Sequence, residues 1–505
     1  MAIELSSITF TDQADVVPAS GVEQILNTGI TNTLAGDDII NGESGHSIPG
    51  VGVPAPNGGV VNTGTLNTDG GNDKLTGINN TNTSFRGYGI YNVKGIIDTG
   101  DGNDILTGIL DTPNQGSEYQ YGIYNENSTI DTGDGDDAII SISNNITDAF
   151  FSSSRRGIYN ENSTIDTGNG NDIIRGNGAS GIENNFGTFN TGNGSDTITG
   201  IGDSTGIYNS GTFNTGDSND IITGTAKSGS GILNSYSSID TGEGNDILTA
   251  IGSYYILYSS GTINTGNGND SIIAEEANGS SLPLYSSANY GTINTGNGND
   301  SISLQGGLYN TGGGMFLGEG NDSLTLTPPK NDIPNRALVN TSIIETGDGD
   351  DIITTSGFID NEGVIETGNG DDSIIVDEGI DDITGTTYGI YNNGGVINMG
   401  DGNDSIITNQ GFESGLNSSG AWFLGEGDDY IKGYGSGDFY GGNGNDTLEL
   451  TPGTYTVGIW GEEGESPIFT KGNQLMITSE FEKLKAGGTI YDFTSLTAGQ
   501  IIIVT

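Results

Sequence analysis

The chain has 505 residues and a net charge of −53, with 89 glycines, only 32% hydrophobic residues and no cysteine. These values exclude a disulfide framework and thiolate metal sites, and they argue against nucleic acid or an anionic membrane as partner, since like charges repel. No segment reaches the roughly 20 consecutive apolar residues of a membrane helix. Residues 1–24 contain no Lys or Arg, so they do not resemble a Sec-type signal peptide.

Residues 1–31 are expected to form an N-terminal cap. They contain Ile3, Leu5, Ile8 and Phe10 in a strand-like alternation and precede the first copy of a repeated motif. The end coil of a stacked repeat needs such a cap because its strand edges are otherwise open.

From residue 32 to residue 450 one motif recurs. Its full form is T-G-x-G-N-D followed, after one free position, by Ile or Leu, as in Thr99–Leu106. Full and relaxed copies together number sixteen, and their aspartates lie 17 to 35 residues apart. Self-similarity of this kind predicts a solenoid rather than several globular domains.

Each repeat contains three short extended segments separated by turns. In the repeat around Asp220, the segments lie in Gly206–Asn209, Gly211–Gly216 and Ile221–Gly224. β-Branched and aromatic residues favour strands, and Gly, Asn and Asp favour turns. We therefore expect an all-β, right-handed parallel β-helix or β-roll solenoid with capped ends. Insertions at 144–156 and 275–287 are expected to leave the coils as loops.

Residues 451–505 depart from the repeat pattern. Gln474–Thr478 alternates like a strand, and the chain ends in Ile501-Ile502-Ile503-Val504-Thr505. We expect this segment to form a C-terminal β cap.

The motif has the chemistry of a calcium turn. Calcium takes six to eight oxygen ligands; glycines at alternate positions expose backbone carbonyls, and the closing Asp adds a charged ligand. One turn offers too few ligands, but two stacked turns can hold an ion between them, which gives at most fifteen gaps for sixteen motifs. The expected ligands are Asp38, Asp73, Asp104, Asp137, Asp172, Asp196, Asp220, Asp246, Asp270, Asp300, Asp322, Asp351, Asp372, Asp404, Asp429 and Asp446.

The alternative is that these aspartates only form turns and bind no metal. The neighbouring Asn103, Asn171 and their equivalents are expected to point outward or to hydrogen-bond between coils.

Near the C-terminal end of the repeats, three nonapeptides follow one another. They are Leu424–Lys432, Gly433–Gly441 and Gly442–Leu450, and the middle one adds Asp438 to the expected calcium ligands. They resemble the repeats of the RTX (hemolysin-type) family of secreted calcium-binding proteins, G-G-x-G-x-D-x-U-x. Over residues 32–423 only one motif occurs per repeat, which favours a three-sided coil there.

The resemblance implies an export route and a folding trigger. RTX proteins leave the cell through a type I pathway with an ABC exporter and an uncleaved C-terminal signal, and Phe481–Thr505 is similar to such a tail. Calcium is scarce inside the cell and plentiful outside, so folding would follow export.

These observations predict a secreted, non-enzymatic calcium-binding protein with a structural, adhesive, cell-surface or matrix role. Cell-surface polysaccharide or matrix is the expected partner. The alternative is a β-helix enzyme, a uronate epimerase or lyase acting on extracellular polysaccharide, for which Arg156 and Tyr159 are the one candidate pair.

Three further features have competing interpretations. The tyrosines of the Gly-Ile-Tyr-Asn segments either stack to stabilise coils or form an exposed ladder that grips polysaccharide. An outward column containing Asp101, Asn169 and Glu243 could contact ice or another crystal, but it is not a uniform Thr array. His46, the only histidine, is interpreted as an incidental surface residue.

Overall fold

A computed structural model describes most of the chain. It covers residues 2–18, 23–44, 57–80, 86–111, 119–143, 155–277, 287–329, 335–377, 388–414, 420–461 and 466–505. His46 and most of the two insertions expected as loops lie outside these ranges. In the described part the only helical elements are two short 3₁₀ turns, η1 (Leu5–Ser7) and η3 (Phe493–Ser495), and no helix there is long and apolar enough to cross a membrane.

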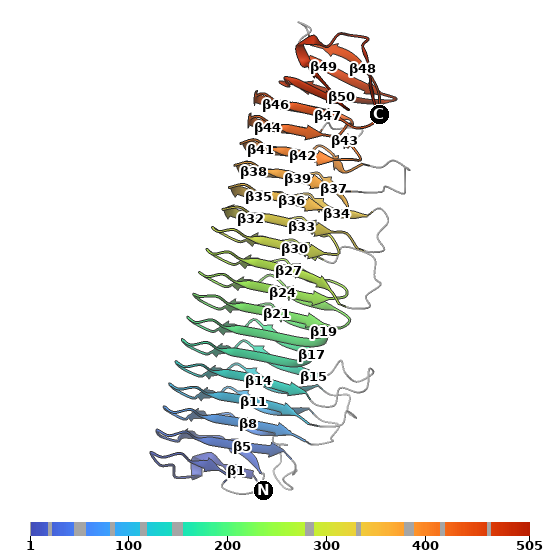
Figure 1. Cartoon of the computed structure of the whole chain (residues 1–505). Coiled ribbons are helices and arrows are strands. Elements are labelled where there is room, and N and C mark those ends of the chain that lie inside the picture. Colours follow the sequence, from blue (N-terminus) through green and yellow to red (C-terminus); the bar gives the residue numbers. More distant parts are fainter. Residues whose placement is uncertain are drawn as a thin grey trace. The chain divides into compact units, whose positions relative to one another are not determined.

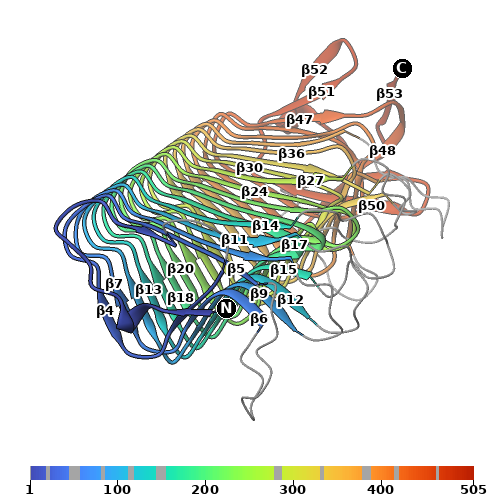
Figure 2. The same cartoon turned by 90° about the horizontal axis from the view of Figure 1, so that it is seen from below.

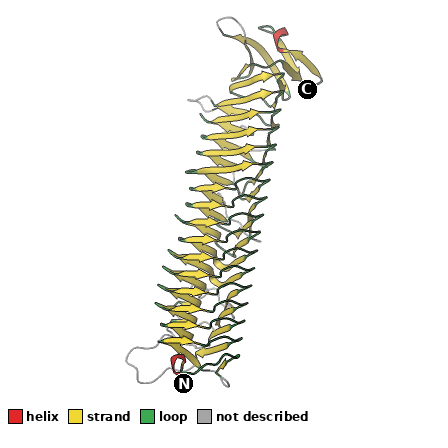
Figure 3. Ribbon diagram, turned by 90° about the vertical axis from the view of Figure 1, so that its left-hand side faces the viewer, coloured by secondary structure: helices red, strands yellow, loops and turns green. Residues whose placement is uncertain are grey.

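The chain divides into two compact units. The first comprises Met1–Gly266 with Ala274–Ser280, and the second Asn267–Ile273 with Ser281–Thr505. Inside each unit the chain repeats a coil of short strands joined by turns (Figures 1 and 3). The expectation of three extended segments per repeat is confirmed, and the strands fall into three types by their position relative to the motif aspartate.

The post-turn strands begin directly after the motif aspartate. They are β5 (Ile39–Ser44), β8 (Lys74–Asn79), β11 (Ile105–Leu110), β14 (Ala138–Ser143), β17 (Ile173–Asn185), β19 (Thr197–Asn209), β21 (Ile221–Ala226), β24 (Ile247–Gly252), β27 (Ser271–Glu276), β30 (Ser301–Gln305), β33 (Ser323–Thr327), β36 (Ile352–Thr355), β39 (Ser373–Val376), β42 (Ser405–Thr408), β45 (Tyr430–Lys432) and β47 (Thr447–Leu450).

The asparagine strands come next, and most of them end in a buried Asn. They are β3 (Gln24–Asn27), β6 (Asn57–Asn62), β9 (Gly87–Val93), β12 (Gln120–Glu126), β15 (Arg155–Glu161), β22 (Ser230–Asn234), β25 (Leu257–Ser259), β28 (Ser287–Asn289), β31 (Leu308–Asn310), β34 (Arg336–Asn340), β37 (Phe358–Asn361), β40 (Ile390–Asn392) and β43 (Phe412–Ser414). The long β17 and β19 supply both types, because each pairs with post-turn strands over its first half and with asparagine strands over its second.

The pre-turn strands lead into the motif. They are β4 (Ile30–Asn32), β7 (Thr65–Asn67), β10 (Ile96–Asp98), β13 (Thr129–Asp131), β16 (Thr164–Asp166), β18 (Thr188–Asn190), β20 (Thr212–Asn214), β23 (Ser238–Asp240), β26 (Thr262–Asn264), β29 (Thr292–Asn294), β32 (Gly314–Glu319), β35 (Ile343–Asp348), β38 (Val364–Asn369), β41 (Val396–Asp401), β44 (Ala421–Gly427) and β46 (Gly437–Gly444).

Each strand pairs in parallel with its equivalent one coil away. Ile105 of β11 lies opposite Ala138 of β14, and Ile96 of β10 opposite Thr129 of β13. Seen from the N-terminal end of the first unit, the chain passes from β12 to β13 to β14 clockwise as it recedes (Figure 2). The fold is therefore a right-handed parallel β-helix, as expected.

The core is a set of apolar columns built from inward side chains of all three strand types. In one coil Leu106, Ile123 and Ile130 come from a post-turn, an asparagine and a pre-turn strand, and all are 0% exposed. Fully burying such a side chain stabilises the fold by about 1.5–3 kcal/mol. In the stack, each coil covers the apolar side chains of the coils next to it. This explains how a chain with few apolar residues forms a core.

Buried asparagines form a second internal column that sequence reasoning did not assign. In each unit the amide Nδ2 of one Asn donates to Oδ1 of the Asn one coil on, at 2.8–3.1 Å. Asn125, for example, donates to Asn160 and to the Thr164 carbonyl, and accepts from Asn92. The column members are Asn27, Asn62, Asn92, Asn125, Asn160, Asn184, Asn209 and Asn234 in the first unit, and Asn289, Asn310, Asn340, Asn361 and Asn392 in the second.

The tyrosines of the Gly-Ile-Tyr-Asn segments stack where consecutive coils carry them. The rings of Tyr91 and Tyr124 lie 5.6 Å apart and those of Tyr124 and Tyr159 5.3 Å apart, nearly parallel in both cases. The stacking interpretation is confirmed for these three residues. It does not extend to Tyr208, whose register partners are Glu183 and Leu233.

Non-repetitive strands cover the two ends. At the start, β1 (Ala2–Glu4) pairs with β3, and β2 (Val16–Val17) pairs with β5. At the end, β48 (Gly453–Trp460), β49 (Ser466–Lys471) and β50 (Gln474–Ser479) form an antiparallel meander, and β53 (Ile501–Val504) adds to β48. A hairpin of β51 (Lys483–Ala486) and β52 (Thr489–Asp492) lies beside the last post-turn strand, β47.

We expect Asn125→Leu to destabilise the coil stack by about 2–4 kcal/mol, because it removes the amide and leaves its buried partners on Asn92 and Asn160 unsatisfied. Hydrogen exchange of β9, β12 and β15 in calcium would measure the loss. The control is Asn127→Gly, two residues away at φ 50° on the surface, which should change exchange little. Equal protection in both variants would contradict a structural role for the asparagine column.

Candidate metal centre

The motif turn is a tight loop in which most copies carry glycine at two positions with positive φ. Gly133 and Gly135, between β13 and β14, have φ of 76° and 155°. A Cβ on Gly135 would lie 1.7 Å from the carbonyl oxygen of Gly102 in the preceding coil. The turn glycines therefore provide both a left-handed backbone and close contact between the backbones of successive coils.

Some turns depart from this rule. Leu34 (φ 69°) and Asp69 (φ 61°) occupy the first glycine position in the first two turns, and Ser218 (φ 104°) occupies the second in the turn that ends at Asp220. L-residues rarely adopt these angles. Their presence shows that the stack holds the turn conformation even without glycine.

The motif aspartates form one column inside the turns of each unit. The backbone N–H of one Asp donates to Oδ1 of the Asp one coil on, at 2.7 Å throughout the first unit and at 2.7–2.9 Å in the second. All sixteen predicted motif residues lie in these columns, each no more than 3% exposed.

The second carboxylate oxygen has no such partner. Among the described residues, Oδ2 is buried without a hydrogen bond in fourteen motif aspartates: Asp38, Asp73, Asp104, Asp137, Asp172, Asp196, Asp220, Asp300, Asp322, Asp351, Asp372, Asp404, Asp429 and Asp446. Burying an ionised carboxylate without compensation costs several kcal/mol. Burial raises the pKa of Asp104, Asp137 and Asp404 to about 7, and for Asp104 and Asp137 it outweighs the opposite effect of the Thr99 and Thr132 hydroxyls.

These turns fit a calcium ion in donor type and charge. Each contributes one buried carboxylate, and the turns bring backbone carbonyl oxygens of one coil close to the turn glycines of the next. All are hard oxygen donors of the kind that calcium prefers. In the described part of the chain no three acidic or histidine side chains converge, so a calcium site here would need backbone oxygens beside the carboxylates of two neighbouring coils.

The residue before each motif aspartate forms an outer ladder that runs the opposite way. The backbone N–H of Asn103 donates back to Oδ1 of Asn72 at 2.9 Å, and that of Asn171 donates back to Asp136 at 2.8 Å. Each turn is thus tied to both neighbours by adjacent residues. The expectation that these asparagines hydrogen-bond between coils is confirmed.

One predicted ligand lies elsewhere. Asp438 is the second residue of β46. It is partly exposed and in register with Ala421 and Ile477, not in a turn. The spacing of the tandem nonapeptides suggested a second turn there. However, the N–H of Asp429 donates directly to Asp446, so Asp438 is not a member of the aspartate column.

Sequence reasoning missed two residues that extend the column. Asp15 donates its N–H to Asp38 at the start, and Glu482 accepts the N–H of Asp446 at the end. Neither lies in a glycine-rich motif, so only the strand register could identify them.

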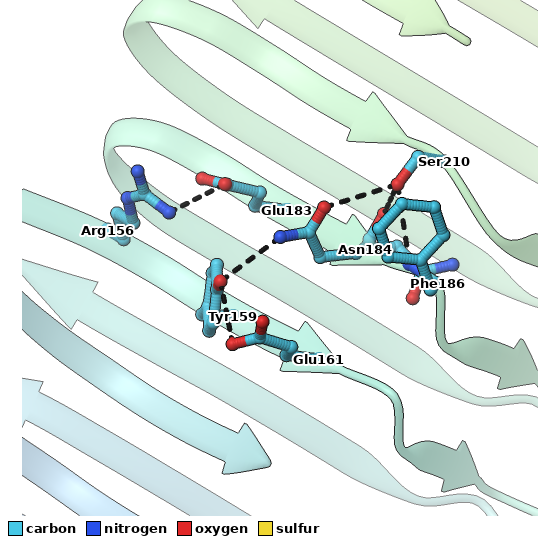
Figure 4. Close-up of polar contacts among 8 residues, drawn as sticks. Arg156, Tyr159, Glu161, Glu183, Asn184, Phe186 and Ser210 are labelled. Atoms are coloured by element: carbon cyan, nitrogen blue, oxygen red, sulfur yellow. Dashed lines mark hydrogen bonds and ion pairs between the residues drawn. The ribbon is translucent and has the colours of Figure 1, made fainter. Parts of the chain in front are cut away.

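The candidate enzymatic pair is engaged in packing. Arg156 forms an ion pair with Glu183 at 2.6 Å and lies over the ring of Tyr159 (Figure 4). The Tyr159 hydroxyl donates to Glu161 and accepts from Asn185, and burial raises the pKa of Tyr159 to about 12. These contacts tie the pair into the wall of the coil.

Comparisons with known proteins add little. No protein-family model matches the sequence, and no curated protein matches it. Among solved structures, the chain is similar to a hyperactive, Ca²⁺-dependent, β-helical antifreeze protein from an Antarctic bacterium, with 15% identity over 97% of this chain and 96% of that chain. The TM-score is 0.36, so the fold assignment rests on the strand register described above.

We expect Gly71→Ala to disrupt its turn, because the new Cβ would lie 2.1 Å from the Gly36 carbonyl oxygen at φ 146°. Its neighbour Gly70 is the matched control: a Cβ there is 3.6 Å from the nearest atom. Thermal unfolding in calcium should show a lower midpoint for Gly71→Ala, whereas Gly70→Ala should change stability by less than about 1 kcal/mol. Similar midpoints would mean that the close approach of the turns is dispensable.

Proposed function

We propose that this chain is an RTX-like, secreted calcium-binding protein with a structural or adhesive role outside the cell. Calcium is bound between stacked coils and drives folding after export. The observation that carries this proposal is the column of buried carboxylates with one oxygen left without a partner.

The net charge supports the same conclusion. A chain with 66 acidic and 13 basic residues repels itself when compact. Divalent ions held between the coils would offset much of that charge where it is most deeply buried. Because the site exists only in the stacked state, binding energy becomes folding energy, which suits a protein that must stay unfolded until it reaches a calcium-rich compartment.

The direct test is folding with and without calcium. We expect the chain to be expanded in chelator and to gain β-structure and compactness when calcium is added, as followed by circular dichroism and small-angle scattering. Elemental analysis of the folded protein should find several calcium ions per chain. A chain that folds equally in chelator and contains no metal would refute the proposal.

A single substitution distinguishes two roles of the motif aspartates: binding calcium, or forming the turn without metal. Asp137→Asn keeps an oxygen for the Asp104 N–H but removes a buried charge. With calcium we expect fewer bound ions by native mass spectrometry and a lower melting temperature; in chelator we expect no loss of residual β-structure, because an uncompensated charge has gone. Turn formers without metal would show no calcium-dependent difference.

The neighbouring Asp136 supplies the control. It is exposed, and its carboxylate only accepts from Asn171 in the outer ladder. Asp136→Asn makes the same charge change one residue away, so it should leave the number of bound ions unchanged.

A further inference from the structure

The aspartate column of the second unit does not end at its last motif. Tyr440 of β46 pairs with Ser479 of β50, and Thr447 of β47 pairs with Lys483 of β51. This register places residues 480–482 where the turn of a further coil would lie, with Glu482 opposite Asp446. Only two residues separate Ser479 from Glu482, whereas five separate Tyr440 from Asp446.

Glu482 makes the contacts of a motif aspartate. The N–H of Asp446 donates to its Oε2 at 2.7 Å, as the N–H of Asp429 donates to Asp446 at 2.9 Å. The residue that follows behaves likewise, since the N–H of Lys483 donates to the Asp446 carbonyl at 2.9 Å. The extra methylene of glutamate spans the distance that the shorter loop leaves.

An unsatisfied oxygen faces this place. Asp446 is 0% exposed, and its Oδ2 has no hydrogen-bond partner. A Cβ on Gly441 would lie 2.9 Å from that oxygen and 2.1 Å from the carbonyl oxygen of Glu480. Both oxygens therefore border the same small space above Gly441. Glu480 has a φ of 62°, in the left-handed region that the motif glycines occupy.

We propose that Asp446, Glu482 and the Glu480 carbonyl form a further calcium site, one beyond the gaps between motifs. The inference rests on the proposed function and adds a specific consequence. The site joins the non-repetitive strands β50 and β51 to the last coil, so docking of the C-terminal cap depends on calcium.

Among the described residues, the N-terminal end has no equivalent site. Asp15 stands opposite Asp38, but its Oδ2 already accepts from the N–H and the hydroxyl of Thr11. That carboxylate is therefore engaged in a local turn, and the backbone N–H of Asp15 closes the first end of the column.

The test counts ions in full-length protein by native mass spectrometry in calcium. Glu482→Gln keeps the oxygen that accepts from Asp446 but loses the charge, and we expect one fewer calcium ion than in the wild type. Glu480→Gln, two residues away, keeps the backbone carbonyl and changes only an exposed side chain, so it should keep the full count. An unchanged count in Glu482→Gln, with the other ions bound, would overturn the inference.

Two further measurements keep the outcome decisive. Asp446→Asn should lose two ions, one on each side, and loss of a single ion would contradict the site even if Glu482→Gln does not fold. Hydrogen exchange in calcium should be faster in β50 and β51 of Glu482→Gln than in the wild type, with the coils before β44 unchanged. If the wild type binds no calcium, the proposed function fails and not this site alone.

Discussion

One constraint governs the rest of this structure: each motif turn buries an aspartate whose carboxylate accepts from the backbone N–H of the aspartate one coil earlier. Oδ1 satisfies a neighbouring N–H, and in fourteen copies Oδ2 is left buried without a partner. An uncompensated buried charge costs several kcal/mol, and burial raises the pKa of Asp104 and Asp137 to about 7. Stacking the coils therefore requires that the negative charge of the column be removed by protonation or balanced by a cation.

Three hydrogen-bonded ladders share the task of fixing the coils. The inner aspartates donate forward along the chain, the outer Asn and Asp residues donate backward, and the buried asparagines donate forward at a different corner. Opposed ladders on adjacent residues prevent a coil from shifting toward either neighbour. The sheets and corners are thereby fixed, while the chain between a post-turn strand and an asparagine strand can vary in length. That freedom explains why motif spacings range from 17 to 35 residues in a regular stack.

The sequence motif predicts features that depend on neighbouring residues in the chain. It does not predict the role of residues whose hydrogen-bond or register partners lie in other coils. Three strands per repeat, the column of sixteen aspartates and the stacking of Tyr124 follow from turn chemistry and repetition. The buried Asn125 looks like an ordinary turn residue, because its role depends on Asn92 and Asn160 in other coils. Asp438 has the spacing of a motif residue, yet the register of β46 places it on a strand. Glu482 has no motif around it and is defined only by pairing across 36 residues.

The direction of the inner ladder makes the two ends of the stack chemically different. Because each motif aspartate offers its N–H forward and its carboxylate backward, the first coil needs only a backbone N–H from the segment before it, which any residue except proline supplies. Asp15 meets that need with its main chain. The last coil presents an N–H instead, and the segment after it must supply an acceptor in the position of a motif carboxylate. A side chain of the right length with an acceptor oxygen is required there, and the short loop before β51 places Glu482 at that point. An acceptor side chain in the C-terminal cap is thus a consequence of ladder polarity, and the same reasoning explains why the N-terminal cap needs none.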